Sequence, residues 1–112
     1  ITPDEGSGEW YLETGSGMGA TLNAGITLGA YVMTDRASWM TFGNKMDAEL
    51  VFEGDPLLFN QYGVIPVNPE KCPKVNVEAA ETFTQWLISD AGQQAIAGYQ
   101  LNGKPLFFPN AN

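Results

Sequence analysis

The first structural transition of the chain is encoded by residues 9–22, EWYLETGSGMGATL. Residues 9–13 are typical of a short extended segment, and residues 14–19 form a glycine-rich turn. Beyond the turn, apolar residues recur near every fourth position from Met18 to Ile26, which is the spacing of one helix face. The pattern predicts an extended segment, a turn and a helix in succession.

The rest of the sequence continues this alternation. Helical spacing predicts a short helix through residues 37–40 and two longer helices, one after Asn76 and one after Ser89. The second of these ends at residues 101–103. Short apolar runs predict further strands at residues 30–34, 48–52 and 62–67. Because strands and helices alternate along the chain, the predicted fold class is α/β.

Polar residues mark the predicted helix starts. Asp35 or Thr34 is placed to cap the helix through residues 37–40, and Asn76 and Ser89 are placed to cap the two longer helices. Side-chain oxygens at these positions accept hydrogen bonds from the free amides of the first helical turn.

The first helix carries small residues within its predicted span. We expect Ser16 or Thr14 to cap its first turn. Gly25 and Gly29 each weaken a helix by roughly 1 kcal/mol relative to alanine. Their small size suggests that another backbone packs closely against this helix.

The charge balance excludes some classes of ligand. The chain has 13 acidic and 5 basic residues, for a net charge of -8. A nucleic-acid backbone or an anionic membrane surface needs a clustered basic face, which this composition does not favour. A small anion is not excluded, because backbone amides at a helix start can hold one without side-chain charge.

The chain has Cys72 as its single cysteine and no histidine. A single cysteine cannot form an intrachain disulfide. Without histidine, the chain cannot carry out Ser-His or Cys-His catalysis, and most kinds of zinc site are excluded. We expect no metal site, no cofactor and no catalytic residue.

Residues 1–8 are rich in turn formers and are predicted to be a flexible lead-in. The chain has neither a starting Met nor a signal peptide, which fits a processed chain, an expressed piece of a protein or a fragment. The resemblance described below leads us to expect a fragment.

The glycine-rich turn has three interpretations that the motif alone leaves open. Its glycines could let the backbone approach an oxyanion held by first-turn amides. Alternatively, Gly15-x-Gly17-x-x-Ala20 with Asp35 further on matches a relaxed dinucleotide fingerprint, although the preceding segment carries Glu9 and Glu13 rather than a buried strand. In the third interpretation, the glycines only form a tight start to a helix.

Two pairs of acidic residues are candidates for glycosidase carboxylates: Glu9 with Glu13, and Glu53 with Asp55. Acidic residues beside turns are usually only solvated, and no other feature supports either pairing.

Five segments together resemble the tungstate-binding proteins of bacterial and archaeal ABC importers. They are collinear and cover nearly the whole chain from Glu9 onward, which is more specific than any one motif. They read WYxExGxGMGxTL at residues 10–22, AYxxTDRASW at 30–39, EGDPxLxNxYxVIxVNP at 53–69, AxxFxxWLxSxxGQxxI at 80–96 and GxxLFxP at 103–109.

The resemblance implies part of a two-lobed type II periplasmic-binding-protein fold of the α/β class. Residues 9–57 would form a second-lobe α/β segment. Residues 58–112 would supply the hinge strand and the C-terminal helices of the first lobe. The upstream half of the family, with a Thr/Ser-rich anion loop and an arginine-bearing loop, is absent from this sequence.

The resemblance also implies an oxyanion site. By similarity to related molybdate binders, the backbone amide of Met18 should contact the anion, and Gly17 and Gly19 should shape the turn around it. Thr34, at the end of the next predicted strand, would offer a hydroxyl contact. Gly25 and Gly29 depart from the better helix formers expected at their positions.

The implied function is binding and not catalysis. The ligand would be tungstate or molybdate, captured outside the cytoplasm, in the periplasm or its equivalent, and delivered to an ABC permease in the membrane. The implied partners exclude nucleic acid, and they include the missing lobe or another copy of the chain.

Overall fold

The structure is a computed structural model that describes residue 5 and residues 8–111. Most of the predicted flexible lead-in at residues 1–8 lies outside the described residues. The chain divides into two units, Ile1–Phe52 and Glu53–Asn112. The predicted lobe boundary after residue 57 stays a prediction. Within the described residues, no helix combines the length and apolar character needed to cross a membrane.

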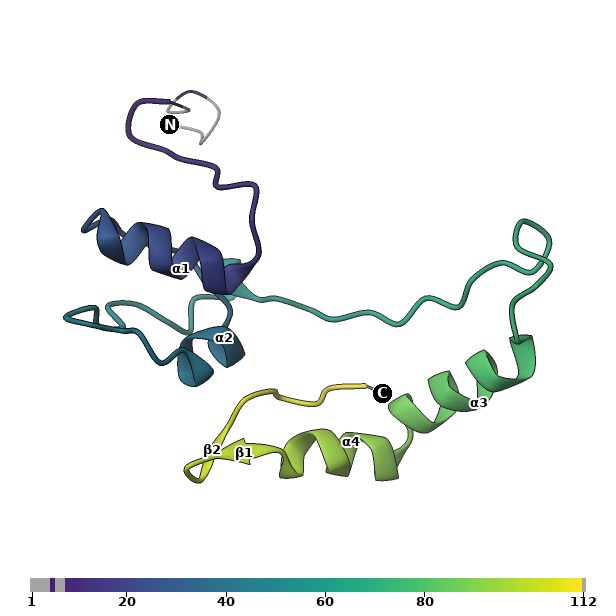
Figure 1. Cartoon of the computed structure of the whole chain (residues 1–112). Coiled ribbons are helices and arrows are strands. Elements are labelled where there is room, and N and C mark those ends of the chain that lie inside the picture. Colours follow the sequence, from purple (N-terminus) through teal and green to yellow (C-terminus); the bar gives the residue numbers. More distant parts are fainter. Residues whose placement is uncertain (1–4, 6–7, 112) are drawn as a thin grey trace. The chain divides into compact units, whose positions relative to one another are not determined.

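The first unit is built around helix α1, Met18–Thr27 (Figure 1). Leu22 on this helix is only 2% exposed and is the main buried side chain of the unit. Gly25 is also buried, and a Cβ there would collide with the side chain of Val32. The prediction that another backbone packs against the small residues is wrong, because the close neighbour of Gly25 is the side chain of Val32 and a Cβ at Gly29 would meet nothing within 4 Å.

The predicted weakening of α1 by Gly29 is wrong, because Gly29 lies beyond the helix end. Its φ is 64°, in the left-handed region that glycine adopts without steric cost. Its amide donates to Ile26 O at 3.0 Å, and the Ala30 amide donates to Gly25 O at 2.9 Å. This pair of bonds is the Schellman arrangement that ends a helix and satisfies its last carbonyls.

Helix α2, Arg36–Thr41, completes the regular structure described for the first unit. Asp35 caps it as predicted: Oδ1 accepts from the Ser38 amide at 2.8 Å, and Oδ2 accepts from the Ser38 hydroxyl at 2.7 Å. A side-chain bond from Asn44 Nδ2 to Asn23 Oδ1, 3.0 Å long, ties the loop after α2 to α1.

The second unit begins with a 3-10 turn, η2, at Pro56–Leu58. Its two long helices are α3, Val77–Ile88, and α4, Asp90–Gly98 (Figure 1). The predicted caps are confirmed: Asn76 Oδ1 accepts from the Ala79 amide at 3.0 Å, and Ser89 Oγ accepts from the Gly92 amide at 3.3 Å.

The break between α3 and α4 depends on a small residue. Gly92 is buried, and a Cβ there would collide with the backbone carbonyl of Trp86. Gly92 lies in the first turn of α4, where the helix comes closest to the end of α3. Because this position has no side chain, the two helices can follow each other with only Ser89 between them.

The end of α4 differs from the prediction. The helix stops at Gly98, and a hairpin follows, with β1 at Gln100–Leu101 paired antiparallel to β2 at Lys104–Pro105. The turn residues Asn102 and Gly103 have φ of 51° and 74°. An Asn-Gly pair with two positive φ values is the favoured two-residue hairpin turn, so the signal was present in the sequence.

The longer strands predicted at residues 9–13, 30–34, 48–52 and 62–67 are not formed as ladders within the described residues, apart from an isolated bridge at Tyr11. A strand exists only when a neighbouring strand accepts its hydrogen bonds. The apolar side chains of these segments are correspondingly open, with Tyr31 94% and Ile65 89% exposed. The segments have the composition of strands but lack a partner within the described part of this chain.

Candidate functional site

The glycine-rich turn leads directly into the first turn of α1. Gly15 has a φ of 60°, so this position requires glycine for the turn itself. Gly17 is the N-cap, with an extended backbone at φ -69° and ψ 167°, and no side chain caps the helix. The expected cap by Ser16 or Thr14 is therefore wrong. The first-turn amides of α1 are left without a side-chain acceptor from the described part of the chain.

The hydroxyl groups around the turn bond to each other instead of capping the helix. Thr14 Oγ1 and Thr21 Oγ1 lie 2.6 Å apart, and Thr21 Oγ1 also donates to Ser16 O at 3.4 Å. Ser16 bonds back to Thr14 through its amide and its hydroxyl, at 3.4 Å and 3.2 Å. Thr21 thus holds the turn from one helical turn further on. The sequence analysis placed Thr21 in the motif at residues 10–22 but gave it no role.

The two remaining glycines of the predicted site are not required by the packing of this chain. A Cβ added at Gly17 or at Gly19 would meet nothing within 4 Å. Both glycines are exposed, and Met18 between them is half-buried. The space beside the first turn of α1 is therefore open to an approaching group.

Thr34 lies in the segment that returns along α1. Val32 of this segment packs on Gly25, in the second half of the helix. Thr34 is half-buried, and its hydroxyl donates to the Asp35 carbonyl at 3.4 Å. The assignment of Gly17, Met18, Gly19 and Thr34 as oxyanion-binding residues stays a prediction.

Two acidic residues of the rival interpretations, Asp35 and Asp55, serve the fold. Both carboxylate oxygens of Asp35 are engaged by Ser38, at the start of α2, which gives this residue a capping role in place of the ribose contact of a dinucleotide site. Asp55 Oδ1 accepts from the Leu57 amide at 2.8 Å and caps η2. In the described part of the chain, no three His, Cys, Asp or Glu side chains are grouped as metal ligands would be.

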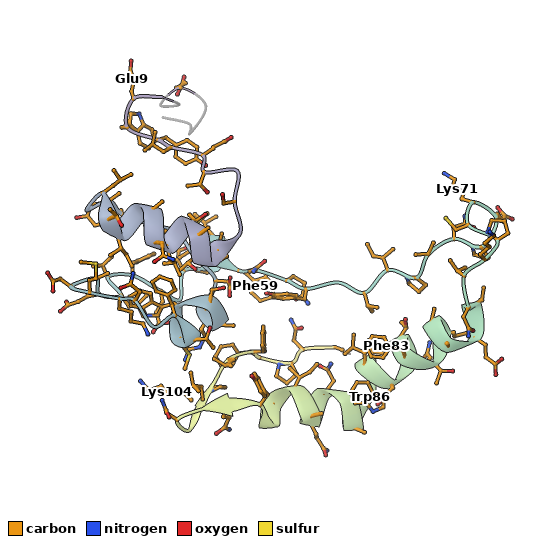
Figure 2. The ribbon with its side chains drawn as sticks, viewed as in Figure 1. Glu9, Phe59, Lys71, Phe83, Trp86 and Lys104 are labelled. Atoms are coloured by element: carbon orange, nitrogen blue, oxygen red, sulfur yellow. The ribbon has the colours of Figure 1, made fainter. Side chains whose placement is uncertain are left out.

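Two shallow, open grooves lie along α3 in the second unit. One has a volume of about 540 Å³ and is bordered by Phe83 and Trp86, whose rings stack with centroids 6.0 Å apart (Figure 2). The other, of about 270 Å³, lies between α3 and the backbone near Pro66 and Val67. The predicted site residues line neither groove.

Comparisons with known proteins agree with the resemblance drawn from the sequence. The model of the PBP superfamily domain matches residues 3–91. A tungstate-binding protein TupA of Peptoclostridium acidaminophilum is 40% identical over 99% of this chain and 38% of its own length. A putative ABC transporter anion-binding protein of Haloferax volcanii is 44% identical over 96% of this chain and 33% of its own length.

A solved structure agrees as well. The tungstate-binding protein TupA from Desulfovibrio alaskensis G20 matches with a TM-score of 0.71 and 43% identity, over 99% of this chain and 46% of that chain. The resemblance and the type II periplasmic-binding fold class are thereby confirmed, and the dinucleotide alternative finds no support. The chain spans about 38% of the first of the curated relatives.

Proposed function

The chain belongs to the PBP superfamily, and on this premise we propose that it forms the C-terminal part of a solute-binding protein that captures tungstate or molybdate for an ABC importer. The support is its likeness to tungstate-binding and anion-binding proteins along nearly its whole length. The proposal places the protein outside the cytoplasm, in the periplasm or its equivalent, where importers of this type collect their solutes.

One local observation carries the assignment of the site. The helix that follows the glycine-rich turn starts at an N-cap without a side chain, and its first-turn amides have no side-chain acceptor within the described residues. Aligned amides and the helix dipole make a helix start favourable for an anion. A site built from backbone groups is also compatible with a chain whose net charge is -8.

Each proposed site residue has a distinct part. The amide of Met18 donates to an anion oxygen, while Gly17 and Gly19 keep the approach free of side chains. Their open surroundings support this part, because the fold itself would accept a Cβ at either position. Thr34 adds a hydroxyl donor from the returning segment.

The proposed mechanism is capture followed by closure, and it makes and breaks no bond. An anion that contacts both lobes stabilises the closed form by its differential affinity for that form. Tungstate and molybdate are dianions that carry no proton, so a site made of donors favours them over protonated oxyanions. Cavity size would then separate them from the smaller sulfate. The relatives bear the names of binding proteins, in agreement with a role other than catalysis.

The proposal includes two protein contacts. The closed form would dock on the membrane permease of the importer. The chain itself would pair with the missing lobe or with another copy, and its apolar surface supports this. Among the described residues, Leu22 and Leu106 are the buried hydrophobic side chains, while many large ones, such as Leu57 at 94%, are exposed. Apolar surface of this extent needs cover by a partner.

Calorimetry on the protein that carries this chain tests the proposed function. Titration with tungstate, molybdate and sulfate should give tight binding of the first two anions, and Gly17→Val should abolish it by filling the approach. Gly43→Val is the matched control, because Gly43 lies in the same unit and a Cβ added there would meet nothing within 4 Å. Unchanged tungstate affinity in Gly17→Val would contradict the site, and absence of oxyanion binding in the unmodified protein would contradict the function.

A further inference from the structure

The turn between β1 and β2 places a side-chain amide beside a backbone nitrogen that can attack it. Asn102 and Gly103 are the two central residues of this turn, and both are exposed. In any asparagine, the nitrogen of the next residue lies within reach of the side-chain carbon Cγ. A glycine at the next position has no Cβ to hinder the approach, so Asn-Gly is the most reactive pairing of this kind.

The side chain of Asn102 is not held by a hydrogen bond to any described residue. Asn60 is also exposed and has no such bond within the same residues, but Gln61 follows it and carries a Cβ. The side chains of five other asparagines are engaged in hydrogen bonds: Asn23, Asn44, Asn68, Asn76 and Asn110. Among the described asparagines, Asn102 therefore combines an unrestrained side chain with a following glycine.

The backbone of the turn can also reach the geometry of the reaction. The attack requires the peptide plane between Asn102 and Gly103 to rotate until the nitrogen faces the side chain. Gly103 has a φ of 74°, and a glycine accepts the opposite sign of φ equally well. The ladder pairs Leu101 with Lys104, so the hairpin does not depend on the Gly103 amide for its pairing.

We propose that Asn102 is a site of spontaneous deamidation. The Gly103 nitrogen bonds to Asn102 Cγ, the bond from Cγ to Nδ2 breaks, and ammonia leaves with the proton of the Gly103 amide. The product of this step is a five-membered imide. Solvent water, the one co-reactant, then opens the imide at either of its two carbonyls and leaves aspartate or isoaspartate at this position.

The two products affect the hairpin differently. Aspartate keeps the length of the main chain, tolerates a positive φ and adds one negative charge at neutral pH. Isoaspartate carries the main chain through the former side chain and lengthens the turn by one carbon, which disturbs the geometry of a two-residue hairpin turn. Leu106 follows the hairpin directly and is 4% exposed, so we expect isoaspartate to loosen its packing. This chemistry is independent of the ligand that the protein binds.

Incubation of the protein that carries this chain tests the proposal. The protein is kept folded in mildly alkaline buffer, well below its thermal midpoint, and its peptides are mapped by mass spectrometry at intervals. The mass change of an amide replaced by an acid should appear at Asn102, with both isomers present, while Asn60 stays intact at the same times. The thermal midpoint of the incubated protein should fall by a few degrees.

Asn102→Gly is the matched variant, because a Gly-Gly pair suits the same turn and has no side-chain amide to lose. Its thermal midpoint should stay constant through the incubation. An Asn102 amide that survives, or that is lost no faster than the amide of Asn60, overturns the proposal. If Asn102 is converted but the midpoint falls equally in Asn102→Gly, the modification stands and its effect on the packing of Leu106 is refuted.

Discussion

Val32 packs against the Cα of Gly25 with no room for a side chain between them. This contact fixes the segment after α1 against the helix. It also explains a glycine inside a helix, where its intrinsic cost is roughly 1 kcal/mol relative to alanine. The helix accepts this cost because a close neighbour occupies the position of the missing side chain.

Gly25→Ala should lower the free energy of unfolding by about 1–3 kcal/mol, because an added methyl group forces Val32 and the helix apart. Urea denaturation of the protein that carries this chain measures the change. Gly43→Ala is the control, since it adds the same methyl group where nothing lies within 4 Å. Equal stability of the two variants would show that Val32 does not rest on Gly25.

Gly29→Ala should also destabilise the protein, by about 1–2 kcal/mol, for a different reason. Its φ of 64° is strained for any residue with a Cβ, while its surroundings would accept one. Gly29→Asn should lose less stability, because asparagine tolerates the left-handed region better than alanine. The order of the two midpoints in thermal denaturation checks the assignment, and an alanine variant as stable as the asparagine variant would refute it.

Gly92→Ala probes the junction of the two long helices. A methyl group there would meet the Trp86 carbonyl, and backbone cannot give way as a flexible side chain can. We expect a loss of about 3 kcal/mol, at the upper end of the range for overpacking. Gly98→Ala, at the exposed end of α4, adds a methyl group in open space and should be nearly neutral. Circular dichroism during thermal unfolding compares the two, and similar midpoints would contradict the close approach.

The helices were predictable from the sequence because their signals are local. Asp35, Asn76 and Ser89 each accept a hydrogen bond from an amide three residues further on, so neighbouring residues decide where the helices begin. The predicted strands depend on distant partners. The segments that contain Tyr31 and Ile65 have the composition of buried strands. Within the described residues, however, no neighbouring strand forms a ladder with them, and both side chains are exposed.

The candidate site also has parts that local sequence predicts and parts that it does not. The glycine turn and the helix behind it follow from the spacing of residues 14–22. The bond between Thr14 and Thr21 could not be read from composition, because it depends on how the turn folds back over the helix. The reciprocal pair of Gln61 and Asn110 spans 49 positions and has no sequence signal at all.

Thr21→Val should weaken tungstate binding without unfolding α1. Valine has nearly the shape of threonine but cannot bond to Thr14 or to the Ser16 carbonyl, so the turn before Gly17 loses its brace. Loss of about one net hydrogen bond, worth about 1 kcal/mol, corresponds to roughly fivefold weaker binding. Thr21→Ser keeps the hydroxyl and should restore most of the affinity. Thr27→Val, which removes a comparable hydroxyl bond to the Asn23 carbonyl at the other end of α1, should leave binding unchanged. If Thr21→Val and Thr27→Val bind tungstate equally well at matched thermal stability, the turn does not depend on Thr21 for its shape.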